Sequence, residues 1–210
     1  DGTVRAWGNG NSGGAAGPTD LSHVTEIYST FFAFCAHLSD GRVRVWGSPG
    51  DGGTQPSNLD VVSSISSSYR AFAALTEHGT VIAWGNPQYG GSMTDVTIDG
   101  VLYTGVPAGM TNVRALYSNY GAFAALMEDG TVQAWGDSMG GKLTSPDLKG
   151  VKSIFSSLGA SVFFSSLGAS TFFSSFGASE ASFFLSFFGI ALFGLFPGLG
   201  ISIKLFSPSN

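Results

Sequence analysis

An eight-residue pattern, Asp/His-Gly-x-Val-x-x-Trp-Gly, constrains the fold of this chain more than any other feature. It occurs four times, as DGTVRAWG, DGRVRVWG, HGTVIAWG and DGTVQAWG, at residues 1–8, 40–47, 78–85 and 129–136. These copies hold all four tryptophans of the chain, at separations of 39, 38 and 51 residues: Trp7, Trp46, Trp84 and Trp135. A period of this size indicates one supersecondary unit per repeat, stacked against its neighbours.

A second block, Ala-Phe-Cys/Ala-Ala, precedes each of the three internal copies, at residues 33–36, 71–74 and 122–125. Ten residues before each of these phenylalanines lies a valine: Val24, Val62 and Val113. We therefore expect three strands per unit, the last two joined at the Asp/His-Gly turn, because Asp-Gly between strand-like runs favours a hairpin. Alternation in Thr131–Trp135 places Val132 and Ala134 on one face and Trp135 on the other. The pattern predicts sheets packed face to face, with the tryptophans in the blade core.

The repeat resembles that of the regulator of chromosome condensation family over about residues 1–160. The resemblance implies a β-propeller, which in that family commonly has seven four-stranded blades. This chain has about four repeats, and Gly-Gly pairs stand where the family usually has GQLG: Gly13-Gly14, Gly52-Gly53, Gly90-Gly91 and Gly140-Gly141. We predict an all-β, partial or truncated propeller-like array of about four blades. Because the sequence begins within a hairpin, we interpret it as a fragment of a larger protein.

The fourth and fifth units depart from the regular spacing. The segment 86–110 is about a dozen residues longer than its counterparts and contains VTI and VLY around Asp99-Gly100. We expect a projecting hairpin there and name as candidate binding loop Val96, Ile98, Asp99, Val101 and Tyr103, because loops on rigid scaffolds often carry binding. An insertion without function is the alternative. A fifth unit begins at Val151, and its strand at 161–164 could close a ring by pairing with residues 3–7, although an open arc is favoured.

Residues 161–210 form a different region, an apolar tail. The sequence from 155 to 181 repeats with a period of nine, as FSSLGASVF, FSSLGASTF and FSSFGASEA, and residues 181–203 contain no charge. Three interpretations remain open: a membrane-embedded segment, since the length meets the requirement of about 20 residues; a frameshift product; or a β-solenoid or aggregation-prone segment of stacked units. Residues 180–196 are expected to be helical.

Composition and residue types argue against several functions. Charged residues make up only 11% of the chain, against roughly 25% in average globular proteins. Residues 1–150 carry 7 basic and 13 acidic residues, which argues against nucleic-acid binding through phosphate contacts. The single cysteine, Cys35, excludes an internal disulfide, which slightly favours an intracellular setting, and is expected to be a small core residue. We predict no catalytic residue, no metal site and no cofactor.

These observations predict a non-catalytic repeat module that acts as a protein-interaction platform. By resemblance, an alternative is guanine-nucleotide exchange on a small GTPase, with the 96–103 hairpin inserted beside the nucleotide. A third alternative is a membrane-anchored repeat protein held by residues 181–203. In each case a protein partner is expected, but its identity is not encoded in a recognisable motif.

Overall fold

The computed structural model describes residues 2–14, 17–18, 21–137 and 149–157, with side chains as far as Ile154, and short strands beyond them. The chain divides into two compact units, Asp1–Phe176 and Gly177–Asn210. The predicted boundary near residue 160 stays a prediction. All described elements are β-strands or short 3-10 turns, so the predicted all-β class is confirmed.

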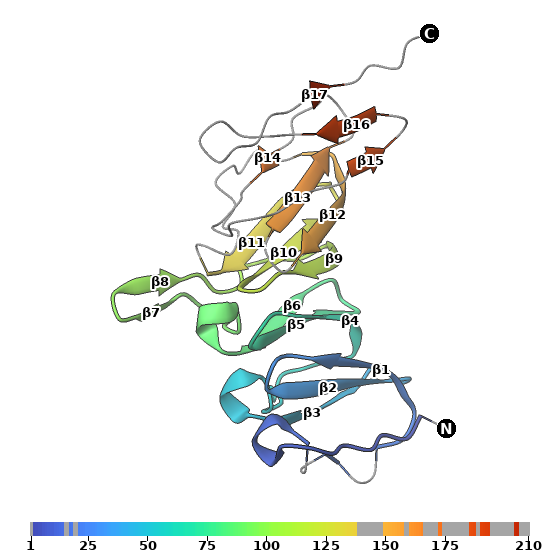
Figure 1. Cartoon of the computed structure of the whole chain (residues 1–210). Helices are drawn as coiled ribbons and strands as arrows, with labels where there is room; N and C mark the ends of the chain where they lie inside the picture. The colour runs from blue at the N-terminus through green and yellow to red at the C-terminus, as the bar shows by residue number, and fades with distance from the viewer. Residues whose placement is uncertain are drawn as a thin grey trace. The chain divides into compact units, whose positions relative to one another are not determined.

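Three antiparallel sheets of three strands each form the regular part of the first unit (Figure 1). The first comprises β1 (Val24–Ser29), β2 (Ala33–Leu38) and β3 (Val43–Gly47). The second comprises β4 (Val62–Ser67), β5 (Ala71–Thr76) and β6 (Val81–Gly85). The third comprises β9 (Val113–Ser118), β10 (Ala122–Met127) and β11 (Val132–Gly136). The three-strand unit predicted from the two sequence blocks is therefore confirmed.

The register of each hairpin explains why the two sequence blocks recur together. The phenylalanine of the Ala-Phe block lies directly opposite the tryptophan, as in the pairs Phe72↔Trp84 and Phe123↔Trp135. In all three sheets the two ring centroids lie 5.4 Å apart. Cross-strand aromatic pairs of this kind are the units that stabilise a sheet.

The central strands of the second and third sheets, β5 and β10, are buried along their whole length, because neighbouring sheets pack against both of their faces. Trp135 and Phe123 pack with Ala73 and Ala83 of the preceding sheet. Val132, on the opposite face of β11, packs with Val151 and Ile154 of the next sheet, and the partly buried Ala134 joins the same cluster. The predicted alternation in Thr131–Trp135 is thus confirmed. Alanines on the facing surfaces let large aromatic rings fit between sheets at the close packing of protein interiors.

A backbone hydrogen bond joins each Asp/His-Gly turn to the next unit. The turn glycines have positive φ, and their carbonyls accept from the amide of the valine that opens the following unit. The four bonds are Val24 N to Gly2 O at 3.1 Å, Val62 N to Gly41 O at 2.8 Å, Val113 N to Gly79 O at 3.1 Å and Val151 N to Gly130 O at 2.9 Å. The turn therefore closes its own hairpin and also positions the next sheet.

The segments after the first three Trp-Gly pairs each form a 3-10 turn in place of the fourth strand that the resemblance implies, and the segment after the last pair lies outside the described residues. The turns are η1 (Gly10–Ser12), η2 (Pro49–Asp51) and η3 (Pro87–Tyr89). Each ends at a glycine with positive φ that lies against the phenylalanine of the next sheet. A Cβ on Gly52 would lie 2.5 Å from Phe72, and one on Gly90 would lie 2.7 Å from Phe123. The first three Gly-Gly pairs are thus sites where one repeat touches the next.

Trp7 contradicts the prediction that all four tryptophans lie in the blade core. Trp46, Trp84 and Trp135 are buried, whereas the side chain of Trp7 is 84% exposed. Residues 2–8 form no strand, and of this copy only Val4 joins a described core cluster, beside Phe34 and Trp46. The physical reason is that Trp7 has no opposing phenylalanine ring among the described residues, whereas the three buried tryptophans each have one.

The fifth unit begins as predicted and forms a sheet of β12 (Val151–Ser157), β13 (Ala160–Ser165) and β14 (Phe172–Phe173). Together with the three regular sheets, this sheet confirms the prediction of about four blades. β13 pairs with β12 and β14, so the alternative pairing of 161–164 with residues 3–7 is not formed.

The second unit contains the short strands β15 (Leu185–Phe187), β16 (Ile190–Phe193) and β17 (Lys204–Leu205), paired antiparallel. The prediction of a helix over 180–196 is therefore wrong for the described residues. Aromatic and β-branched residues such as Phe187 and Ile190 favour strand over helix. No helix in the described part of the chain has the length and apolar character needed to cross a membrane. Most of the predicted anchor, 181–203, lies outside the described residues.

Candidate functional site

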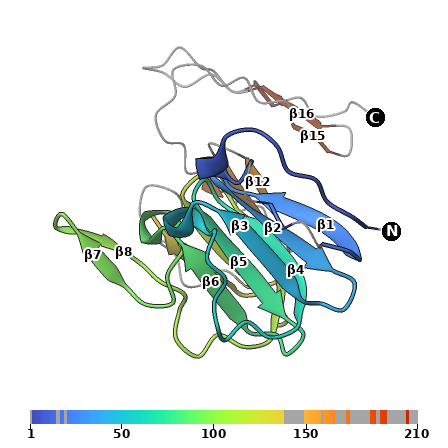
Figure 2. The ribbon, with the colours of Figure 1, turned by 90° about the horizontal axis from the view of Figure 1, so that it is seen from below.

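The predicted binding loop is a hairpin, β7 (Val96–Ile98) and β8 (Val101–Tyr103), which projects from the sheets (Figures 1 and 2). Asp99 and Gly100 have φ of 50° and 77°, which fits the type I′ turn that favours tight hairpins. Val101 and Leu102 are exposed near the tip, while Val96, Ile98 and Tyr103 are half-buried. The structure thus places all five predicted loop residues together.

The base of this hairpin is fixed to the third sheet. Thr104 and Gly136 exchange two backbone hydrogen bonds, of 3.2 and 2.9 Å. Gln88 Nε2 donates to the Tyr103 hydroxyl at 3.3 Å, and Asp95 Oδ1 accepts from the Gly105 amide at 3.0 Å. The hairpin is consequently a projection with a rigid base, joined to η3 on one side and β11 on the other.

Sequence analysis missed a second feature, a row of aromatic rings across the turns between the first two strands of each sheet. We call Phe31, Tyr69, Tyr89 and Tyr120 the aromatic ladder. The ring centroids of Phe31 and Tyr69 lie 5.0 Å apart, and those of Tyr69 and Tyr120 lie 4.6 Å apart and nearly parallel. Tyr89 of η3 contacts both Tyr69 and Tyr120, at 5.6 and 5.7 Å.

Backbone bonds hold the ladder in register. The amide of Phe31 donates to the Tyr69 carbonyl at 2.9 Å, and the amide of Tyr69 donates to the Tyr120 carbonyl at 3.0 Å. The turns themselves are held by the side chains that precede the aromatic residues. Thr30 Oγ1 accepts from the Ala33 amide at 2.9 Å. Asn119 Oδ1 accepts a hydrogen bond from the Ala122 amide at 2.9 Å. Such local side-chain bonds favour turns over continued strands.

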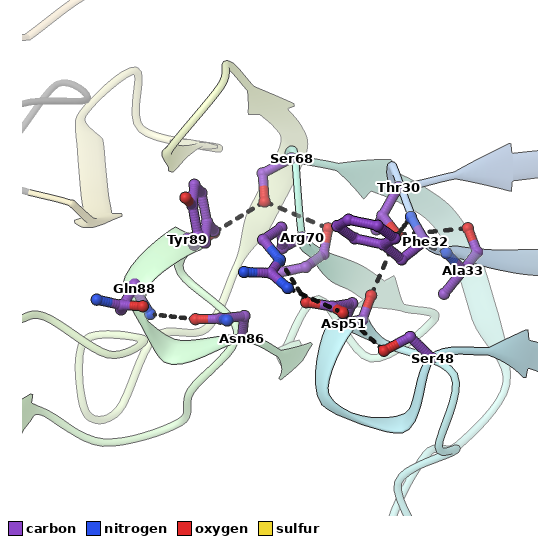
Figure 3. Close-up of polar contacts among 11 residues, drawn as sticks. Thr30, Phe32, Ala33, Ser48, Asp51, Ser68, Arg70, Asn86, Gln88 and Tyr89 are labelled. Atoms are coloured by element: carbon purple, nitrogen blue, oxygen red, sulfur yellow. Dashed lines mark hydrogen bonds and ion pairs between the residues drawn. The ribbon is translucent and has the colours of Figure 1, made fainter. Parts of the chain in front are cut away.

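An ion pair lies close to Tyr89 of the ladder (Figure 3). Arg70 Nε lies 2.6 Å from Asp51 Oδ1, and Arg70 Nη2 donates to Asp51 Oδ2 at 3.2 Å. Ser48 Oγ also donates to Asp51 Oδ2, at 2.6 Å. The Arg70 guanidinium lies over the Phe32 ring at 5.0 Å and near the Tyr89 ring at 5.9 Å. Hydrogen bonding to Asp51 raises the pKa of Arg70 above its usual value, so the guanidinium stays charged.

A periodic signal for the ladder was present in the sequence. Phe31, Tyr69 and Tyr120 each lie three residues before the phenylalanine of the Ala-Phe block. Aligning the repeats on that phenylalanine would have found them. Tyr89 and Arg70 have no counterparts of the same type in the other repeats, so their contacts could be found only from the structure.

Cys35 and His37 do not form a reactive pair. Cys35 is fully buried, as predicted for a core residue, and burial raises the pKa of its thiol to about 12. A reactive cysteine needs the opposite shift, toward a thiolate at neutral pH. The ring of His37 lies 2.9 Å, through Nε2, from the Val62 carbonyl of the next sheet. Within the described residues, no three His, Cys, Asp or Glu side chains are grouped as metal ligands would be.

Residues 62–90, which cover β4 to β6 and η3, match the Regulator of chromosome condensation (RCC1) repeat family. This unit is a repeat of the RCC1 type. The match spans the most regular unit, including Phe72, Trp84 and Gly90. Among curated protein sequences, none is significantly similar to this chain.

Solved structures similar to the chain support the same repeat architecture. Yeast RCC1 (Prp20), solved with bound Kap60, matches with a TM-score of 0.50 and 22% identity, over 68% of this chain and 40% of that one. Prp20p from Saccharomyces cerevisiae, described with its binding to Gsp1p and histones, matches with a TM-score of 0.51 and 21% identity, over 68% and 41%. The CRINKLY WD40 ectodomain of the Arabidopsis thaliana receptor kinase ACR4 matches with a TM-score of 0.52 and 14% identity, over 80% and 58%. At these identities the likeness shows the propeller fold, and the RCC1-type chain spans about two fifths of the yeast proteins.

Proposed function

We propose that this RCC1-type chain is a non-catalytic interaction module, and that the aromatic ladder and the β7–β8 hairpin together form its docking face for a partner protein. One observation carries the proposal. Of the seven large hydrophobic side chains that are exposed among the described residues, five lie on the ladder turns or the 86–110 insertion: Phe31, Met93, Val101, Leu102 and Tyr120. Exposed apolar side chains gathered in this way mark interaction sites.

The topology brings these five residues to one end of the sheets. Ala71 is paired with Gly85, and Ala122 with Gly136, so the ladder turns lie beside the segments that follow each Trp-Gly. Tyrosine, phenylalanine and methionine are enriched at protein interfaces. The ladder is also held by backbone bonds and an internal ion pair, so a partner would meet an ordered surface and little ordering entropy would be lost on binding.

The proposal is tested by site-specific photocrosslinking in cell extract, with the crosslinker placed at residue 102. The captured partner is then identified and its binding measured with purified proteins. We expect the double variant Phe31→Ser/Tyr120→Ser to weaken this binding at least tenfold, as loss of interface aromatic residues does. The matched control is Trp7→Ser, which removes an aromatic side chain that is more exposed but lies outside the ladder. Equal effects of the two changes would overturn the proposal.

Guanine-nucleotide exchange on a small GTPase is a second candidate, and the hairpin favours it. Its exposed tip residues, Val101 and Leu102, stand on a base fixed to Gly136 and η3, which suits a wedge inserted into a partner. The test measures release of a fluorescent guanine nucleotide from a panel of purified small GTPases. Exchange would require acceleration that is lost in Val101→Ser/Leu102→Ser. No acceleration across the panel would remove this candidate.

A further inference from the structure

A polar pocket lies on the first sheet, at the end opposite to the aromatic ladder. β1 and β2 pair Ser29 with Phe34 beside the ladder turn and Val24 with Leu38 at their other ends. The pocket lies at these other ends and has a volume of about 400 Å³. That volume is within the range of small-molecule sites. Its polar lining consists of Ser22, His23, Ser39, Asp40, Arg42 and Arg44.

Two guanidinium groups line the pocket, and they differ in their partners. Arg42 is paired with Asp40, whose Oδ2 lies 2.6 Å from Arg42 Nη2 and accepts from Arg42 Nε at 2.7 Å. Arg44 donates from Nη1 to the Val43 carbonyl at 3.1 Å and forms no ion pair within the described part of the chain. Asp40 is the only carboxylate among the residues that line the pocket. The pocket therefore carries an uncompensated positive charge at Arg44, although the whole chain has a net charge of -5.

Hydrogen bonds hold the two walls of the pocket together. The Ser39 amide donates to the His23 carbonyl at 2.9 Å, which joins the segment before β1 to the turn after β2. Thr25 Oγ1 donates to the His37 carbonyl at 3.1 Å and links the same two strands. Ser22 Oγ lies 3.0 Å from His23 Nδ1, so a hydroxyl and an imidazole stand side by side in the lining. The pocket thus combines uncharged hydrogen-bonding groups with its two guanidinium groups.

The charge of this pocket is specific to the first of the three regular sheets. In the other two sheets, the positions of Arg42 and Arg44 are uncharged and the position of Ser39 is a glutamate. These residues are Thr80, Ile82 and Glu77 in the second sheet and Thr131, Gln133 and Glu128 in the third. The same three-stranded sheet therefore forms without the arginines, so the strand pattern does not require them. The first repeat has lost a carboxylate and gained two guanidinium groups at one place.

We propose that this pocket binds a phosphate monoester, with the Arg44 guanidinium as its main contact and Arg42 beside it. The Ser22 and Ser39 hydroxyls supply further donors. A guanidinium presents a planar fork of N–H groups that matches phosphate oxygens bidentately. A phosphate monoester has three strong acceptor oxygens and a charge of about -1.5 to -2 at pH 7. It can therefore accept from several walls of the pocket at once, whereas a carboxylate has only two oxygens and a single charge.

The experiment uses the full chain and a fluorescein-labelled peptide with one phosphoserine, followed by fluorescence anisotropy at low and moderate salt. The comparison peptides hold serine or glutamate at the same place. We expect the phosphoserine peptide to bind at least tenfold more tightly than either, and salt to weaken its binding. Competition with unlabelled phenyl phosphate separates two sources of the phosphate group. Displacement as effective as that by the unlabelled phosphopeptide indicates a small phosphorylated molecule, and much weaker displacement indicates a phosphorylated protein.

Two substitutions test the pocket with residues that the other sheets carry. Arg44→Gln introduces the third-sheet residue and should weaken phosphopeptide binding about tenfold or more, as loss of a hydrogen bond to a charged group does. Ser39→Glu adds a second carboxylate to the lining and should weaken binding at least as much, because it repels the phosphate. Arg114→Gln is the matched control. Arg114 is an exposed arginine of β9 outside the pocket lining, so its loss should leave binding unchanged.

Three results would overturn the inference: equal binding of the phosphoserine and serine peptides, equal or tighter binding of the glutamate peptide, or a loss in Arg44→Gln no larger than that in Arg114→Gln. Thermal unfolding checks that each variant is folded, which the exposure of the three side chains predicts. The inference does not rest on the docking function, because the pocket and the ladder lie at opposite ends of the first sheet. Crosslinking at residue 102 and phosphopeptide binding therefore fail separately.

Discussion

Trp7 and Trp135 lie in octapeptides that differ at one position, DGTVRAWG and DGTVQAWG, yet their surroundings differ completely. Trp135 is 1% exposed, whereas Trp7 is 84% exposed. The indole of Trp135 stacks on Phe123, and its Nε1 donates to the Gly90 carbonyl at 3.1 Å. Trp84 repeats this arrangement with Phe72 and the Gly52 carbonyl, also at 3.1 Å.

The difference shows that the octapeptide does not determine its own structure. It needs a phenylalanine strand upstream, which provides the opposing ring, and a glycine carbonyl from the preceding repeat. Trp46 is an intermediate case, since it is buried against Phe34 but its indole N–H has no acceptor in the described part of the chain. Stability is therefore a property of neighbouring repeats taken together, as in other repeat proteins.

The largest effect expected from this comparison is on the buried tryptophans. Trp135→Ala removes a buried ring and leaves a cavity, and should lower the free energy of unfolding by about 3–5 kcal/mol. Trp7→Ala removes a solvent-exposed side chain and should change the free energy of unfolding by less than about 0.5 kcal/mol. Urea denaturation followed by circular dichroism measures both. A loss for Trp7→Ala that approached the loss for Trp135→Ala would mean that the first copy is packed after all.

The glycines whose carbonyls accept hydrogen bonds from the tryptophans test the same interface between neighbouring repeats. Gly90 has a φ of 86°, and a Cβ there would lie 2.7 Å from Phe123. Gly90→Ala combines left-handed backbone strain with overpacking and should destabilise by about 2–4 kcal/mol. Gly109 has a φ of 74° with nothing within 4 Å, so Gly109→Ala should show only the backbone strain, about 1–2 kcal/mol. Equal losses in the two variants would show that contact between repeats at Gly90 is unimportant.

Much of the fold followed from periodicity. The spacing of the Ala-Phe and Asp-Gly-x-Val-x-x-Trp blocks predicted strands, turns and the face of each residue, because a β-strand alternates strictly and an Asp-Gly turn fixes the register. The hairpin around Asp99-Gly100 was predicted on the same grounds. The burial of Trp7 and a helix over residues 185–187 and 190–193 were predicted wrongly, since burial depends on a partner strand and short apolar runs do not distinguish helix from strand.

The ladder could not be predicted in full. The recurrence of Phe31, Tyr69 and Tyr120 is visible in an alignment of the repeats, but their stacking depends on the distance between sheets. The Arg70–Asp51 pair joins residues from two repeats that carry no equivalent pair elsewhere. Position 51 is matched by Ser12 and Tyr89, and position 70 by Phe32 and Gly121. A contact that occurs once in a repeat array has no period to indicate it.

The Arg70–Asp51 ion pair, which joins two repeats, can be compared with an ion pair that lies within a single turn. Arg70→Gln leaves the buried Asp51 carboxylate with only part of its hydrogen bonding and removes the ring contact with Phe32, so it should destabilise by about 1–3 kcal/mol. The control is Arg42→Gln, whose partner Asp40 lies in the same turn with both side chains exposed. An exposed pair of this kind is screened by solvent and contributes little to stability, so the loss should be the smaller of the two. Urea midpoints for the two variants give the difference, and a larger loss in Arg42→Gln would contradict the importance of the inter-repeat pair.

The smallest effect concerns Cys35, which occupies the position of Ala73 and Ala124 in the other sheets and is buried between the first and second sheets. Burial raises the pKa of its thiol to about 12 in the folded chain, from about 8.5 in an unfolded one. The unfolded state therefore releases this proton first, and the thiol's contribution to stability is full below about pH 8.5 and falls as pH rises toward 12, by at most about 1.4 kcal/mol per pH unit.

Cys35→Ala removes this dependence while costing about 1 kcal/mol or less at pH 7. Urea midpoints of both proteins at pH 7.5 and pH 10 measure this dependence, and titrating groups that do not contact Cys35 contribute equally to both proteins and cancel. The variant should gain on the parent chain as pH rises. A constant difference would mean that Cys35 is not shielded by the neighbouring sheet, and that the first sheet, like the copy that holds Trp7, is less tightly packed than the second and third.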